Sequence, residues 1–529
     1  MGLVRVCNQV GKRLDSEKTS PRSRNAFRCF ADVLIKAHTQ KHTSKMPAYF
    51  QTHLILLLFV VQLMPINPVA EDGTLGKNRK RLNPVVHTEA PELDPISDAY
   101  RYCNLPNLTE HTREGHSPAD YKLLFVQVMI RHGDRYPLYS IPQTKRPAID
   151  CTLSPHRKPS HPLLASFISH MAQGGRGHWD ASLGSLARVP NHSTCELGEL
   201  TQTGVVQHLK NGELLRQVYL KHHKLLPPDW SSQQLWVETT AKSRTLQSSL
   251  ALLYGFLPSF DWSKVMVRHQ RSTMFCGSWC DCPARNLFLD EEQRRQYHLR
   301  ISNAELEHTY VDMAKALGVA TRTMRAANPI DALLCHLCHN LPFPCASPNS
   351  FPSLENGACL TLQHFAVIRQ QQRDDERERK KAGIYRRFAV LAAYPFLNRT
   401  AVHMERAARD NSEPVFALAS AHDITMAPVL SALGLEGAGF PRFAARLVFE
   451  LWKSPDAKVK GTRGGVANAY VRVLYNGEDL TFETAFCRDH DRHSTQPLCP
   501  LGNFLSFVRR DMFSIVNATS YHQACHRTY

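Results

Sequence analysis

Residues 123–137 read LLFVQVMIRHGDRYP, an apolar run that ends in two arginines placed around one histidine. The run before Arg131 predicts a strand buried on both faces. Like charges repel, so Arg131 and Arg135 close to His132 are unfavourable unless an anion offsets them. A solvated basic turn after a strand is the simplest alternative, and the rest of the chain has to decide between the two.

Two further segments repeat the order of a short apolar strand followed by a helix. QLWVETT (234–240) precedes AKSRTLQSSLALLYGFLP (241–258), and VFALASA (415–421) precedes HDITMAPVLSALGL (422–435). Strands that alternate with helices predict an α/β fold with a mainly parallel sheet flanked by helices.

Three other segments complete the expected core. Residues 199–220 predict an amphipathic helix capped by Thr201 or Thr203. Residues 444–452 and 469–482 predict two antiparallel strands joined by a Gly-rich loop.

The charged residues of all three strand–helix units follow the carboxyl end of their strand. Ligands of open α/β sheets bind at this edge. One basic turn arises easily by chance, whereas three strand ends that deliver cations, histidines and an acid to one edge do not. The predicted site contains Arg131, His132, Arg135, Arg244, His422 and Asp423.

These residue types suit the chemistry of a phosphate monoester. The planar forks of Arg131, Arg135 and Arg244 bond phosphate oxygens in pairs and stay charged, so they form a clamp without a metal. His132 can attack as a neutral imidazole and give a covalent phosphohistidine.

The His422–Asp423 pair is expected to supply a proton for the leaving group and one more hydrogen bond to the phosphate. Asp423 is expected to be the general acid for the leaving alkoxide, which requires acidic conditions or a raised pKa. His422 is expected to donate a further hydrogen bond to the phosphate. Helix capping by Asp423 is the structural alternative.

RHGDRYP resembles the R-H-G-x-R-x-P signature of the histidine acid phosphatases, HD their second motif, and SRTLQS the segment with their third arginine. The resemblance implies that His132 is the nucleophile and Asp423 the proton donor. It also implies that phosphate is bound without a cofactor, on a parallel-rich α/β core with a mostly helical cap. The phosphate-binding residues implied are Arg131, Arg135, Arg244 and His422.

Five further segments are similar to a branch of this family: RHGDRYPLYSIPQTKRPAIDCTL (131–153), CELGELTQTGVVQHL (195–209), RAANPIDALLCHLCHN (325–340), FPRFAARLVFELW (440–452) and FVRRDMF (507–513). The similarity runs from about residue 85 to the C-terminus. That resemblance implies a Golgi type II membrane enzyme that removes the 2-phosphate from xylose in the glycosaminoglycan–protein linkage tetrasaccharide and so permits chain elongation. It leaves room for a glycosyltransferase partner of the same pathway. Composition and spacing do not indicate xylose.

The domain organisation follows from composition and from the expected strands. An apolar run from Leu54 to Leu63 predicts a signal-anchor, with a cleaved signal peptide and secretion as the alternative. Met46 is an alternative start codon. The expected parts are a basic cytosolic tail or upstream extension (1–45), the signal-anchor segment (46–70), a luminal stem (71–98), the phosphatase core (99–265 and 390–529) and an inserted, cysteine-rich helical cap (266–389).

The 15 cysteines and several N-x-S/T sequons indicate an oxidising, glycosylating compartment. Thirteen cysteines follow the apolar run, so at least one is unpaired within the chain. CHLCH (335–339) also satisfies a haem-attachment pattern and, with two of Cys276, Cys280 and Cys282, a zinc set. Disulfides that fasten the cap are the preferred interpretation. The sequons lie at Asn107, Asn191, Asn398 and Asn517.

Other functions remain as alternatives. The same chemistry fits inositol polyphosphates or lysophosphatidate, and a phosphohistidine could also pass its phosphoryl group to another hydroxyl. A non-catalytic glycan-binding protein on the same fold would be expected to lack one of the six site residues. The net charge of +17 favours anionic partners, but no nucleic-acid-binding motif is present. The run QQQRDDERERKK (370–381) predicts an exposed helix face.

Overall fold

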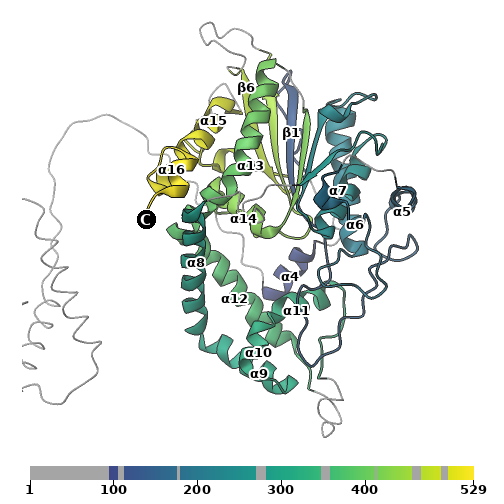
Figure 1. Ribbon diagram of the computed structural model, residues 1–529, viewed down its shortest axis with the longest axis vertical. Coiled ribbons are helices and arrows are strands. Elements are labelled where there is room, and N and C mark those ends of the chain that lie inside the picture. The colour runs from purple at the N-terminus through teal and green to yellow at the C-terminus, as the bar shows by residue number, and fades with distance from the viewer. Residues whose placement is uncertain are drawn as a thin grey trace, which may run out of the picture. The chain divides into compact units, whose positions relative to one another are not determined.

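The structure is a computed structural model (Figure 1). The expected tail, the signal-anchor segment, nearly all of the stem, and Asn107 lie outside the residues it describes. Within the described part, no helix is both long and apolar enough to cross a bilayer. The described residues are 94–104, 112–174, 179–269, 282–346, 358–410, 414–455, 466, 468–489 and 498–529.

A mixed sheet forms the centre of the molecule, in the order β3-β2-β4-β1-β5-β6-β7, with β8 also paired to β6. One half is parallel and pairs β3 with β2, β2 with β4 and β4 with β1. The other half is antiparallel and begins with β5, as the two expected antiparallel strands required. The strands are β1 (Lys122–Arg131), β2 (Leu235–Thr239), β3 (Val267–His269), β4 (Phe416–Ala421), β5 (Arg446–Lys453), β6 (Ala469–Tyr475), β7 (Glu478–Asp479) and β8 (Cys499–Pro500).

Helices cover both faces of the sheet (Figure 1). The side chains of β1 alternate between two cores: Phe125 and Met129 pack with the first group of helices, Val126 and Val128 with the second. A central strand is therefore apolar on both faces, which explains its unbroken apolar run. The first group includes α13 (Gly383–Asp410), α14 (Asp423–Ala432) and α15 (Leu501–Arg509), and the second α5 (Leu164–Gln173), α6 (Gln202–Leu215) and α7 (Ser243–Phe256).

The expected helix after residue 199 is confirmed as α6. Thr201 is its N-cap and accepts a hydrogen bond from the Gly204 amide. Beyond Leu215 the helix continues with π-helical geometry over Arg216–His222.

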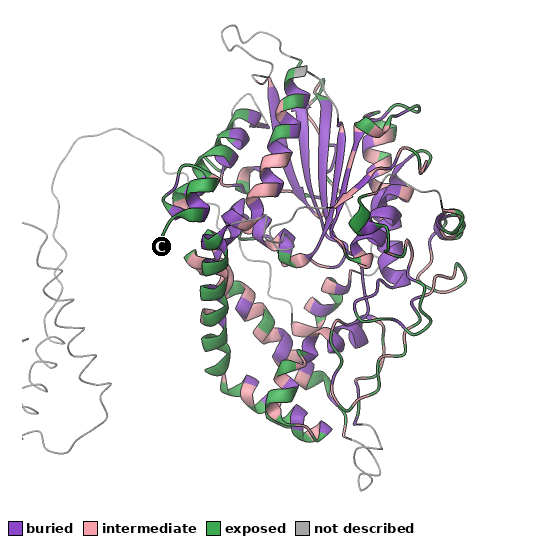
Figure 2. Ribbon diagram, viewed as in Figure 1, coloured by how far each residue is buried: buried purple, intermediate pink, exposed green. Residues whose placement is uncertain are grey.

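The cap helices lie at the carboxyl edge of the parallel strands, and α4 (Pro95–Cys103) packs beside them (Figure 1). Figure 2 shows the strands buried along their length, whereas α8 and α9 expose a broad face. The domain boundaries expected at 266 and 389 stay a prediction. The cap helices are α8 (Pro283–Ile301), α9 (Ala304–Leu317), α10 (Thr321–Ala326), α11 (Pro329–Cys338) and α12 (Leu362–Lys381).

The prediction of an exposed face over residues 370–381 is wrong in part. The run does lie on a helix, α12, but most of it is half-buried. Asp375 is buried and forms an ion pair with Arg300 of α8, with 2.6 Å between Oδ2 and Nε. A partner distant in sequence therefore turns part of the charged run inward.

Disulfides fasten the cap, as preferred, and the zinc alternative is wrong, because Cys338 is not a thiolate. Cys338 is bonded to Cys103 of α4, and Cys282 to Cys525 of α16 (Tyr521–His526). Their sulfurs are therefore not thiolate ligands. Among the described cysteines, Cys335 alone is a free thiol, and it is buried. Further disulfides join Cys151 to Cys195, Cys345 to Cys359 and Cys487 to Cys499.

Candidate active site

Three neighbouring strands, β2, β4 and β1, bring the predicted residues to one edge. His132 follows β1, His422 follows β4, and Arg244 lies in the first turn of α7 after β2. The His132 amide donates to the Ala421 carbonyl at 3.0 Å, and the rings of His132 and His422 are 5.4 Å apart. All six predicted residues therefore belong to one cluster, which the ion pair and the electrostatic couplings described below connect.

The turn after His132 depends on two glycines. A Cβ on Gly133 would lie 2.5 Å from the Gly204 Cα and carbonyl oxygen, and a Cβ on Gly204 would lie 2.3 Å from the Asp134 carbonyl oxygen. Such contacts are shorter than any packing allows, so both residues must lack a side chain for the loop to rest on the start of α6.

The His132 imidazole is set up as a neutral base and nucleophile. Its Nδ1 lies 2.8 Å from the Gly133 carbonyl oxygen, which can only accept, so Nδ1 carries the hydrogen. The lone pair is then on Nε2. Burial, reinforced by Arg244 and Arg131, holds the pKa of His132 well below its usual range.

The Arg131 guanidinium is fully buried between two aromatic rings. It lies 4.8 Å from the ring centroid of Tyr102 and 4.6 Å from that of Phe443, and its Nη1 donates to the Pro441 carbonyl at 2.6 Å. Its Nε has no partner. Its Nη2 contacts Asp423 Oδ2 at 2.9 Å as an ion pair without the alignment of a hydrogen bond.

Arg135 and Arg244 also keep buried donors unused. Arg135 pairs with Asp331 of the cap, while its Nε has no partner. Arg244 Nε has none either, and burial together with Arg135 lowers the pKa of Arg244 to about 10. Buried guanidinium hydrogens without acceptors are costly, so the site is complementary to an anion.

His422 is held by Thr240, whose Oγ1 lies 2.9 Å from His422 Nε2. Burial, with Arg244 adding to it, lowers the pKa of His422 to about 3. The imidazole is therefore neutral. It begins the turn into α14, and its amide donates to Thr425 Oγ1.

The expectation of a raised pKa for Asp423 is wrong for the free site. Burial favours the neutral carboxyl, but Arg131 and Arg135 outweigh it and hold the pKa of Asp423 below its usual range. The sequence placed the acid next to His422 but did not reveal that Arg131 would contact it directly.

Several residues of the site were not predicted. Tyr102 and Phe443 enclose Arg131, and Thr240 orients His422. Asp331 and His339 of the cap contact the loop that follows β1, residues 132–137, which we call the catalytic loop. CHLCH did include His339, but only as part of a haem-attachment pattern. No local pattern marks the other four.

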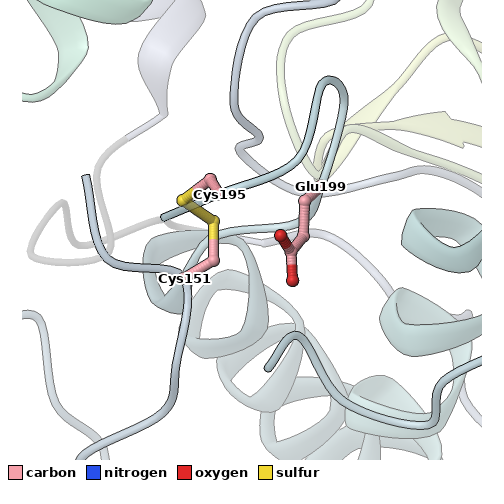
Figure 3. Close-up of side chains that lie close together, drawn as sticks. All are labelled: Cys151, Cys195 and Glu199. Atoms are coloured by element: carbon pink, nitrogen blue, oxygen red, sulfur yellow. A yellow bond between two sulfur atoms is a disulfide. The ribbon is translucent and has the colours of Figure 1, made fainter. Parts of the chain in front are cut away.

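A second cluster resembles a metal site but is not one. Cys151, Cys195 and Glu199 lie close together, and Figure 3 shows the two sulfurs joined to each other. The Glu199 carboxylate instead accepts amide hydrogens of Asn191, His192 and Glu196. This loop supports the site, because the Tyr136 amide donates to the Glu199 carbonyl at 2.8 Å.

The predicted glycosylation sites differ in access. Asn191 and Asn517 are exposed, whereas Asn398 is half-buried within α13. Their use remains a prediction.

Comparison with known proteins decides the family. Residues 122–476 match the model of the histidine phosphatase superfamily, branch 2. The chain belongs to this superfamily. The enzyme class expected from the sequence, a phosphoric monoester hydrolase, is thereby confirmed.

Named relatives of this histidine phosphatase extend beyond the matched region. This chain is 69% identical over 485 residues to 2-phosphoxylose phosphatase 1 of Danio rerio, and the alignment covers 90% of this chain and 96% of the relative. It is 54% identical over 479 residues to 2-phosphoxylose phosphatase 1 of Homo sapiens, covering 89% and 96%. A solved structure, the apo form of a multiple inositol polyphosphate phosphatase from Bifidobacterium longum, is similar with a TM-score of 0.45 and 14% identity, covering 78% of this chain and 98% of that one.

Proposed function

We propose that this histidine phosphatase removes the 2-phosphate from xylose in the glycosaminoglycan–protein linkage tetrasaccharide, through a phosphohistidine. One observation carries the chemistry: three arginines with buried, unpartnered N–H groups surround a neutral histidine. The choice of substrate is supported by the name that its relatives carry, 2-phosphoxylose phosphatase 1.

The reaction then has two steps. His132 Nε2 attacks phosphorus, the P–O bond to the sugar breaks, and Asp423 gives its proton to the departing oxygen. A water next attacks phosphorus, the N–P bond breaks, and its electron pair returns to Nε2 while the Asp423 carboxylate takes the proton of the water. Arg131, Arg135, Arg244 and His422 hold the phosphoryl oxygens throughout.

Substrate binding itself prepares the acid. The cations that hold the pKa of Asp423 low are Arg131 and Arg135. A phosphate dianion placed against them offsets their charge, so the pKa of Asp423 rises when the substrate arrives. The negative charge of the bound phosphate therefore favours protonation of Asp423 in the complex, whereas Asp423 stays ionised in the free enzyme.

A cavity beside the exit of the catalytic loop has the chemistry for the rest of the oligosaccharide. It is a hollow open to solvent, and it lies between the loop after the signature and α11. Aromatic, cationic and hydroxyl side chains are suited to sugar rings and carboxylates. The lining includes Tyr136, Tyr139, Ser140, Thr144, Lys145 and Arg146.

We further propose a Golgi membrane location with the catalytic part in the lumen, anchored by residues 46–70. The disulfides support an oxidising compartment. The exposed sequons at Asn191 and Asn517 support a glycosylating one.

The test measures phosphate release by the purified protein from a linkage oligosaccharide that carries 2-phosphoxylose, and from p-nitrophenyl phosphate. We expect release from both, no release from either by His132→Ala, and unchanged release by His522→Ala, an exposed histidine of α16. Release from the aryl phosphate alone would keep the chemistry and reject the substrate. Full turnover by His132→Ala would reject the phosphohistidine.

A further inference from the structure

The cap contacts the catalytic loop at two successive residues. Asp331, in the first turn of α11, accepts two hydrogen bonds from Arg135, at 2.8 Å from Nη2 and 3.2 Å from Nη1. His339, directly after α11, has its Nε2 2.8 Å from Asp134 Oδ2. One cap helix therefore contacts the loop through both of its ends.

The Asp331 contact fixes how Arg135 is presented. With Nη1 and Nη2 bound to the carboxylate, and Nη1 also donating to the Tyr136 carbonyl, the guanidinium plane is set. Its Nε, which has no partner, is buried. Asp331 also accepts the Leu138 amide hydrogen at 2.6 Å, so one carboxylate fastens both the arginine and the backbone beyond it.

The Asp134 contact fastens the loop on its other side. Asp134 is buried, its amide donates to Gln207 at 2.8 Å, and its carboxylate also accepts from the Thr201 hydroxyl. His339 comes directly after Cys338, which is bonded to Cys103. The end of α11 that carries His339 is therefore held covalently.

We propose that Asp331 and His339 are positioning residues for catalysis, through which the cap holds Arg135 and Asp134 of the catalytic loop in the geometry that receives phosphate. The inference rests on the proposed phosphatase activity and adds to it a function for the cap. A misplacement of about 1 Å in such a site costs about 10²-fold in rate.

The charge of Asp331 makes the inference testable. A carboxylate beside a phosphate-binding arginine lowers the positive potential of the site. If Asp331 acted through charge alone, its neutralisation would tighten the binding of anions. If it positions Arg135, the same change weakens the binding of anions and slows turnover.

The experiment compares Asp331→Asn and Asp331→Ala with Asp375→Asn in the full chain. Asp375 is the matched control, because it is a buried cap carboxylate in an ion pair with Arg300 on a different pair of helices. The measurements are kcat and KM with p-nitrophenyl phosphate, inhibition by inorganic phosphate, and the thermal midpoint. We expect about a 10²-fold loss of kcat/KM and weaker phosphate inhibition in Asp331→Ala, and a smaller loss in Asp331→Asn, which retains an acceptor.

Two results would overturn the inference: tighter phosphate inhibition in both Asp331 variants, or kcat/KM in them equal to that of Asp375→Asn at a similar thermal midpoint. If Asp331→Ala does not fold, Asp331→Asn decides. An inactive wild-type protein would instead reject the proposed function, which keeps the two failures distinguishable.

His339 is tested by a double-mutant cycle with Asp134, and His161→Asn is the control. His161 is a buried histidine paired with a carboxylate, as His339 is, with 3.2 Å between its Nε2 and Glu213 Oε2, but it belongs neither to the cap nor to the catalytic loop. We expect His339→Asn and Asp134→Asn to lower kcat, and the double variant to lose no more than the stronger single one. Additive losses in kcat would separate His339 from Asp134 and remove it from the proposal.

Discussion

Two buried arginine clusters lie in opposite halves of the sheet, and they differ in what their guanidinium groups contact. In the antiparallel half, Arg446 contacts Glu114 and Asn211, and Arg472 contacts Glu450 and Asp479. Every guanidinium nitrogen of these two arginines has an acceptor, since backbone carbonyls also contribute.

At the carboxyl edge of the parallel half the acceptors are too few. Asp423 contacts Arg131 and Asp331 contacts Arg135, while Arg244 Nε, Arg131 Nε and Arg135 Nε have no partner. Three arginines meet two carboxylates there, whereas two arginines meet three carboxyl groups in the antiparallel half. Burial of arginine therefore does not identify a functional site, whereas unused donors on three neighbouring arginines do.

The largest effects are expected from one substitution in each cluster. Arg244→Gln should lower kcat/KM by about 10³-fold or more, because the arginine stabilises the transferring phosphoryl group, and should leave the thermal midpoint equal or higher. Arg446→Met should leave Glu114 buried without its cation and cost about 3–5 kcal/mol of stability, with kcat of the folded protein unchanged.

Activity assays and thermal unfolding at one scan rate check both halves of this comparison. The comparison would fail if Arg446→Met lost activity while its thermal midpoint stayed unchanged. It would also fail if Arg244→Gln lowered the thermal midpoint and kept a normal kcat.

Asp423→Asn should sharpen the assignment within the catalytic cluster. We expect turnover of alkyl phosphates to fall by about 10²–10⁴-fold, because an alkoxide needs a proton on departure. Release of nitrophenolate in the first turnover of p-nitrophenyl phosphate should fall much less, since nitrophenolate leaves without one. Equal losses in first-turnover release of the alcohol and of nitrophenolate would reject Asp423 as the general acid, and Asp331→Asn serves as the comparison for a general loss of geometry.

An anion should stabilise the protein, and more so in acid. Burial and the arginines depress the pKa of His132 and of His422, the latter to about 3. Each histidine thus binds a proton in the unfolded chain before the folded one, and stability falls by about 1.4 kcal/mol per pH unit per histidine below about pH 6.5.

Sulfate, whose charge is constant over this pH range, offsets the positive charge of the arginines and so reduces the loss of stability in acid. At 100 times its dissociation constant it should add about 2.7 kcal/mol, and more as the pH falls. Thermal midpoints with and without sulfate measure this, and Arg244→Gln should reduce the effect. If stabilisation by sulfate became smaller as the pH fell, anion binding would not be coupled to protonation of the two histidines.

The smallest effect concerns the cap contact. Burial alone would lower the pKa of His339, but Asp134 raises it above the usual value. The pair therefore contributes stability that is complete below about pH 6.5 and is lost as the pH rises through the raised pKa. Relative to His339→Asn, the wild type should gain about 1–2 kcal/mol in acid and lose that gain at alkaline pH. A constant difference across the range would mean that the pair is not ionic.

The sequence predicted what depends on local pattern. Apolar runs located β1, β2 and β4, and the residues that follow each run were sufficient to assemble the site, because parallel strands share one carboxyl edge. Thr201 was one of the two caps considered for α6 and is the one observed, and its partner lies only three residues away.

What the sequence missed depends on contacts between distant residues. Asp331 lies 196 residues from Arg135, and Cys338 lies 235 residues from Cys103. The pKa of Asp423 moved opposite to expectation because Arg131, from another strand, contacts it. Periodicity and spacing carry no information about such pairs.

The disulfides of the cap determine where this protein can be cut. The region shared across the superfamily spans residues 122–476, yet α4 before it supplies the ring of Tyr102 over Arg131, and both flanks are bonded to the cap, through Cys103 and Cys525. A fragment trimmed to the family boundaries would lose an aromatic wall of its phosphate site and leave two thiols exposed to mispairing. Expression fragments, tags and chimaeras should therefore keep everything from Asp94 to Tyr529 as one unit, and family boundaries are a poor guide to where that unit ends.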